Sequence, residues 1–66
     1  MMDTRPTLKS LRIIKGMTQK QAAQALHVNP GTLSKWERGL SYPDAAEIKR
    51  ILALYNIEYI EVNFLT

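Results

Sequence analysis

TQKQAAQALHVNPGTLSKWERG, residues 18–39, decides the fold, because it holds the start signals of two short helices with almost nothing between them. Thr18 followed by Gln21 is a capping box, and apolar residues then recur at helical spacing. Asn29 is a second N-cap residue, and Pro30 suits the first position of the helix that it opens. The stretch therefore predicts two helices that meet at a sharp turn.

The second of these helices has two chemically different sides. At 100° per residue, Leu33, Trp36 and Glu37 fall on one side. That side is predicted to pack inward, while the other stays free, which is the layout of a helix that reads DNA. The free side carries small and basic residues, namely Gly31, Ser34, Lys35 and Arg38.

A carboxylate on the inward side needs a partner, because an unpaired buried charge is costly. Arg12 is the predicted partner of Glu37, since it lies beside Leu8 and Leu11 on one face of an earlier helix. We expect this ion pair to be structural.

Composition limits the class of protein. Sixty-six residues fit one domain, residues 1–66, and the absence of cysteine excludes disulfides and thiolate metal sites. No stretch approaches the roughly 18 apolar residues of a membrane span, and the first residues lack the apolar run of a signal peptide. We therefore expect a soluble, cytoplasmic protein with no membrane partner.

Charge is unevenly placed along the chain. Residues 1–43 hold seven Lys and Arg against two acidic residues, a balance of +5, and residues 44–66 hold two against four, a balance of −2. The basic part contains the two-helix unit. This asymmetry suggests a surface that faces phosphates, although solvated charges alone would give the same count.

The first helix is predicted from about Pro6 or Thr7 to Lys15, with Gly16 stopping it. On this helix Ile14 is expected to be half-buried beside Leu11. Ile13 falls on the far side, where it is either an isolated exposed residue or part of a patch covered by the tail or a second subunit.

A fourth helix is predicted after the loop at residues 40–43, because Asp44 followed by Glu47 is another capping signal. It places Leu54 outward and ends near Asn56. Its inward residues are Ile48, Ile51, Leu52 and Tyr55.

The tail after Asn56 fits two patterns. Ile60, Val62 and Phe64 alternate with polar residues as in a strand, while Ile57, Ile60 and Phe64 also fit a helical turn. The favoured interpretation is a short helix near residues 59–63 followed by an extended end.

Three segments carry a resemblance to a known family: LKSLR at residues 8–12, KGMTQ at 15–19 and TLSKWERG at 32–39. With Ala23, Val28 and Pro43 in addition, the chain resembles the phage repressor and Cro-like helix-turn-helix family over nearly its whole length. The resemblance implies an all-α, compact, five-helix lambda-repressor-like domain with the helix-turn-helix at helices 2 and 3. The positions of Arg12 and Glu37 also look like a pair that recurs in the family.

In such domains the recognition helix enters the major groove, and the start of the preceding helix touches phosphates. The resemblance makes Gln19 the phosphate contact and Lys35 a donor to guanine, with Thr32 or Pro30 packing on a thymine methyl. The implied DNA-binding residues are Gln19, Asn29, Pro30, Gly31, Thr32, Ser34, Lys35, Arg38, Ser41 and Tyr42.

Each of these residues also has a simpler interpretation. Lys35 and Arg38 are alternatively just solvated, Asn29 only a helix cap, and Tyr42 a residue packed under the fourth helix.

Two departures from the family pattern stand out. His27 occupies a turn position where the family usually has a glycine, so we interpret it as a cap with positive φ rather than as a metal ligand or catalytic group. Pro30 and Gly31 have no hydrogen-bonding side chains, so direct base reading should be sparse and DNA shape should contribute to specificity.

The predicted partner is double-stranded DNA, bound by a homodimer at least on a palindromic site. The candidates for the two-fold contact are Leu54, Tyr59, Ile60, Phe64 and Leu65, which alternatively close a small core.

The leading hypothesis is a sequence-specific transcriptional regulator, a small phage-type repressor or Cro-like protein. One alternative is an antitoxin or a restriction-modification control protein, and another is an antirepressor-like module that binds protein instead of DNA. Enzymatic activity is not expected, because no convergent carboxylates, activated nucleophile or glycine-rich phosphate loop is recognisable. The sequence implies no cofactor, metal or small-molecule substrate.

Overall fold

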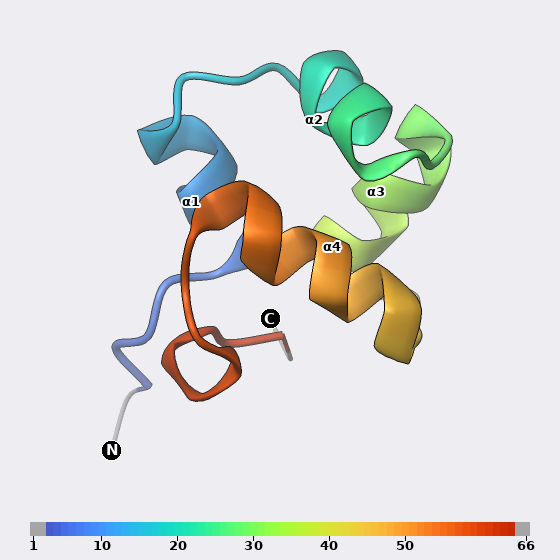
Figure 1. Cartoon of the computed structure of the whole chain (residues 1–66). Coiled ribbons are helices and arrows are strands. Elements are labelled where there is room, and N and C mark those ends of the chain that lie inside the picture. Colours follow the sequence, from blue (N-terminus) through green and yellow to red (C-terminus); the bar gives the residue numbers. More distant parts are fainter. Residues whose placement is uncertain (1–2, 65–66) are drawn as a thin grey trace.

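The computed structural model describes residues 3–64, and in this range the fold is all-helical apart from one isolated bridge. The expected count of five α-helices is wrong, because residues 3–64 form four α-helices followed by a single turn of 3-10 helix (Figure 1). In chain order the elements are α1 Leu8–Ile14, α2 Gln19–Leu26, α3 Pro30–Glu37, α4 Ala45–Tyr55 and η1 Tyr59–Glu61.

Side-chain caps begin all four α-helices. The predicted capping boxes at Thr18 and Asp44 are confirmed, with Thr18 Oγ1 accepting from the backbone N–H of Gln21 at 3.1 Å. Thr7 caps α1 through Ser10, so α1 begins at Leu8, inside the predicted range. These local signals fix where each helix starts before any packing occurs.

A core of nine apolar residues draws on all four α-helices and on the tail. Within it, α2 packs against both α3 and α4, and α1 packs against α3. The predicted inward residues of α4 take part, with Ile51 fully buried and its neighbours half-buried. The core consists of Leu8, Ala22, Ala23, Leu26, Leu33, Trp36, Ile51, Val62 and Phe64.

The tail turns back beside the start of the chain (Figure 1). The predicted helix at residues 59–63 is the shorter η1, and residues after it are extended as expected. Asn63 donates its backbone N–H to the carbonyl oxygen of Pro6 at 2.9 Å, within a parallel bridge between Thr7 and Asn63. Arg5 adds a hydrogen bond from Nη1 to the carbonyl oxygen of Ile60 at 3.2 Å. The tail thus closes the core from the N-terminal side.

Two burial predictions are wrong. Leu54 is half-buried against the core and does not face outward; a helical wheel of α4 cannot show this, because it contains none of the residues from other segments that build the core. Ile14 is 79% exposed, because α1 ends at this residue and no described element covers it. Ile13 is exposed as well, at 57%.

The predicted ion pair between Arg12 and Glu37 is confirmed. Arg12 Nε donates to Glu37 Oε2 at 2.8 Å and Nη2 donates to Oε1 at 3.2 Å, while the Glu37 side chain is only 2% exposed. The hydrogen bond to Glu37 raises the pKa of Arg12 above its ordinary value. Nη1 of the same guanidinium donates to the carbonyl oxygen of Met17 at 3.0 Å, so the pair also fixes the segment between α1 and α2.

Glu37→Ala is expected to lower the free energy of unfolding by about 3–5 kcal/mol, because the substitution leaves the Arg12 charge largely buried and unpaired. A domain of this size has only about 3–10 kcal/mol of stability in total. Urea unfolding followed by Trp36 fluorescence measures the loss, with Lys9→Ala, an exposed cation on α1, as the control. A loss below about 1 kcal/mol would show that the pair is not essential to the fold.

Candidate nucleic-acid interface

The turn between α2 and α3 is as short as the sequence predicts. His27 ends α2 in the left-handed region, with φ 59° and ψ 39°, which confirms its interpretation as a cap with positive φ. Its backbone N–H donates to the carbonyl oxygen of Gln24 at 3.2 Å, and Val28 donates to that of Ala23 at 3.0 Å. Asn29 then caps α3, so the chain reverses between two fixed helix ends.

The two sides of α3 lie as predicted. Leu33, Trp36 and Glu37 are buried, and Lys35 and Arg38 are exposed. In residues 3–64 neither cation forms an ion pair, although Arg38 Nε makes a long hydrogen bond of 3.4 Å to the carbonyl oxygen of Ser34. The described part of the chain therefore leaves Lys35 and Arg38 on this side of α3 exposed to a partner.

The first turn of α3 is shaped by its cap. Asn29 Oδ1 accepts the backbone N–H of Gly31 at 2.8 Å, which confirms the N-cap. A Cβ at position 31 would lie 3.2 Å from the same oxygen, so Gly31 makes room for the capping amide. Asn29, Pro30 and Gly31 are all exposed, and Thr32 and Ser34 are half-buried.

Gln19, the predicted phosphate contact, is held by an interaction that the sequence did not reveal. Its Nε2 donates to Glu37 Oε1 at 3.0 Å, so the first residue of α2 is joined to the last residue of α3. The side chain is half-buried at the edge of the Arg12–Glu37 pair.

Comparison with known proteins places this chain in a family. A family model described as helix-turn-helix matches residues 8–62, which cover α1 to η1. The chain belongs to the helix-turn-helix family. This result confirms the resemblance inferred from the sequence segments.

Two characterised relatives carry the same unit. The chain is 36% identical over 56 residues to the HTH-type transcriptional activator BcrR of Enterococcus faecalis, covering 85% of this chain and 28% of the relative. It is 38% identical over 50 residues to the HTH-type transcriptional regulator ImmR of Bacillus subtilis, covering 76% of this chain and 39% of that protein. The match thus spans well under half of either relative. No solved structure matches the chain significantly.

The loop after the helix-turn-helix places two further predicted residues at the surface. Ser41 is exposed, and Tyr42 is 48% exposed. The Tyr42 hydroxyl lies 3.1 Å from that of Tyr59, and its ring centroid is 5.9 Å from that of Phe64. Tyr42 therefore packs against the tail, and the hydrogen bond to Tyr59 raises the pKa of the Tyr42 hydroxyl.

Sequence reasoning missed Arg50. From α4, its Nε donates to the carbonyl oxygen of Leu26 at 3.0 Å, which satisfies the C-terminal end of α2 immediately before the turn. No local signal in the sequence could find this contact, because the two residues are 24 positions apart.

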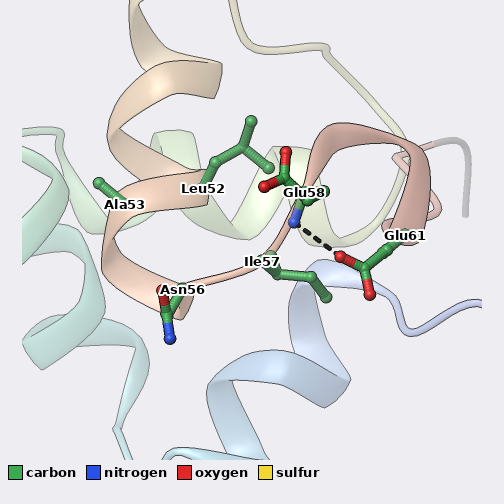
Figure 2. Close-up of a pocket in the computed structure, with 6 residues that line it drawn as sticks. All are labelled: Leu52, Ala53, Asn56, Ile57, Glu58 and Glu61. Atoms are coloured by element: carbon green, nitrogen blue, oxygen red, sulfur yellow. Dashed lines mark hydrogen bonds between the residues drawn. The ribbon is translucent and has the colours of Figure 1, made fainter.

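A separate hollow of about 410 Å³ lies at the C-terminal end of α4 (Figure 2). It is acidic at its edge and contains no residue of α2 or α3, so it is distinct from the candidate interface. Neither here nor elsewhere in residues 3–64 do three His, Cys, Asp or Glu side chains gather as metal ligands do. The hollow is lined by Leu52, Ala53, Asn56, Ile57, Glu58 and Glu61.

His27→Gly is expected to stabilise the domain by about 0.5–1 kcal/mol, because glycine adopts the left-handed conformation without the steric cost that a Cβ imposes. Thermal unfolding measures the change. Asn56→Gly is the control: Asn56 also has a positive φ, of 51°, but asparagine tolerates this conformation better, so its gain should be smaller. A loss of stability in His27→Gly would contradict the strained-cap interpretation.

Proposed function

We propose that this chain is a sequence-specific DNA-binding transcription regulator of the phage repressor and Cro type, which reads the major groove with the free side of α3. The observation that carries the proposal is the two-sided burial of α3, with Trp36 inward and Lys35 outward and, within residues 3–64, in no ion pair. Membership of the helix-turn-helix family and two relatives named as HTH-type transcription regulators support it.

The distribution of charge supports the same orientation. Lys20 on α2 is exposed, as are Lys35 and Arg38 on α3. The carboxylates of Glu58 and Glu61 lie at the hollow beyond α4. A polyanion would therefore be attracted to the helix-turn-helix side and repelled from the other end.

On this proposal some residues contact bases and others contact the DNA backbone. Lys35 donates to guanine O6 or N7, and Thr32 or Pro30 packs on a thymine methyl. Arg38, Ser41 and Tyr42 lie along the flanking backbone. Asn29, Gly31 and Ser34 complete the surface that approaches the bases, with few hydrogen-bonding groups among them.

We further propose that two copies bind a palindromic site, since one domain offers few contacts. Tyr59 and Ile60 are the exposed members of the predicted two-fold contact, at 53% and 76%. Leu54 and Phe64 pack in the protein's own core, and Leu65 lies outside the described residues.

A second candidate function is a module that binds protein. The exposed Ile13 and Ile14 favour it, because adjacent apolar side chains at a helix end are typical of a contact surface. None of the helices in residues 3–64 has the length and apolar character of a bilayer-spanning segment.

Duplex binding against salt separates the two functions. Each phosphate neutralised contributes about −0.9 to the slope of log K against log salt, so a DNA regulator should show a slope steeper than about −2. Fluorescence anisotropy of a labelled duplex between about 50 and 200 mM salt measures it. Absent or salt-insensitive binding would exclude the DNA function.

Lys35→Ala and Arg38→Ala should change different properties of DNA binding. Lys35→Ala removes a base contact and should relax the preference at one base pair per half-site by about 1–3 kcal/mol. Arg38→Ala removes a phosphate contact, so it should weaken binding to all sequences alike and reduce the slope of log K against log salt by about one per half-site. Selection of bound duplexes from a random pool measures both effects, with Lys49→Ala on α4 as the charge-matched control. Unchanged preference in Lys35→Ala would refute its assignment to a base.

A further inference from the structure

The buried ion pair of this domain extends to the surface through one more side chain. Glu37 Oε1 accepts from two donors, Arg12 Nη2 at 3.2 Å and Gln19 Nε2 at 3.0 Å. Arg12 comes from α1, Gln19 from the start of α2 and Glu37 from the end of α3. One carboxylate therefore joins three helices, and its third contact is the residue expected to touch a phosphate.

The chemistry of this contact fixes which way the Gln19 amide faces. An ionised carboxylate only accepts hydrogen bonds, so the nitrogen and not the oxygen of the amide must point at Glu37. An amide nitrogen carries two hydrogens about 120° apart. One hydrogen is directed at Glu37, whose side chain is 2% exposed, so the second is left for another acceptor at the half-buried edge of α2.

We infer that Glu37 is a positioning residue for DNA binding: it holds the Gln19 amide so that the second hydrogen meets a phosphate at the start of α2. This inference rests on the proposed function. It assigns the Arg12–Glu37 pair a role in binding beyond its role in the fold. Because the amide is already ordered, binding does not have to immobilise a flexible side chain.

The amide contact is tested first by Gln19→Met, which keeps the length of the side chain and removes the hydrogen bonds. It should weaken duplex binding about tenfold or more, as expected for a hydrogen bond to a charged group. Because a neutral amide displaces no counterion, the salt slope should not change. Gln24→Met, an exposed glutamine on α2, is the matched control and should bind like the wild type.

Positioning is tested by a cycle with the double variant Arg12→Met/Glu37→Met, since buried ion pairs are often replaced by apolar residues without loss of folding. The double variant should lose about as much affinity as Gln19→Met. Adding Gln19→Met to it should then cost little more. An equal cost of Gln19→Met in both backgrounds would overturn the inference, as would wild-type affinity in the double variant.

Side-chain NMR relaxation of the free wild-type protein provides a readout that needs no DNA and no variant. The Gln19 amide should be nearly as rigid as the backbone, and the Gln24 amide mobile; equal mobility of the two would overturn the inference. Failure of the proposed function and failure of this inference give different results. If the wild type binds no duplex, the proposed function is wrong, whereas if it binds and Gln19→Met binds equally well, only the role of Gln19 and Glu37 is wrong.

Discussion

The structure depends on the burial of one carboxylate. Glu37 lies on the core side of α3, where an unpaired charge would be prohibitive, so the fold must bring partners to it. Arg12 and Gln19 meet this requirement from α1 and α2. Satisfying Glu37 therefore sets the relative placement of three helices. Once Glu37 is held inward, the opposite side of α3 has to face solvent, which exposes the basic residues proposed to contact DNA.

The turn between α2 and α3 is the second constraint, and side chains outside the turn hold it in place. His27 adopts a left-handed conformation, which a residue with a Cβ rarely does unless its surroundings enforce it. Arg50 from α4 binds the carbonyl oxygen of Leu26, and Asn29 caps the helix that follows. Both ends of the turn are thus fixed by side chains, so the angle between α2 and α3 follows from polar contacts as much as from apolar packing.

Local signals in the sequence were sufficient for the helices and for the buried side of α3. Capping boxes and helical periodicity each depend on residues a few positions apart, and the inward position of Glu37 called for a partner, for which Arg12 on the earlier helix was the obvious candidate. In the tail, periodicity placed a short helix near residues 59–63, but the bridge to Thr7 could not be predicted in this way, because it depends on packing between the two ends of the described chain. The same holds for Leu54, for Arg50 and for the link from Gln19 to Glu37. The base-contact residues were proposed from family resemblance; in the structure Lys35 and the residues at the start of α3 are exposed, while Thr32 and Ser34 are half-buried.

The start of α3 offers few groups that can read bases, so the fixed arrangement of Arg12, Gln19 and Glu37 matters for how the domain is placed on DNA. Pro30 and Gly31 offer no hydrogen-bonding side chains, and the Asn29 oxygen is engaged by the cap. If α3 reads DNA as proposed, few groups are available to correct its position by contacts with base edges, and the domain must be placed on the duplex mainly through phosphates. Phosphate contacts specify a position only when the groups that make them are fixed relative to the reading helix. The hydrogen bond from the Gln19 amide on α2 to Glu37 at the end of α3 meets that condition directly. Because Glu37 is itself held by the buried ion pair, the proposed phosphate contact stays at a fixed position relative to the exposed side of α3.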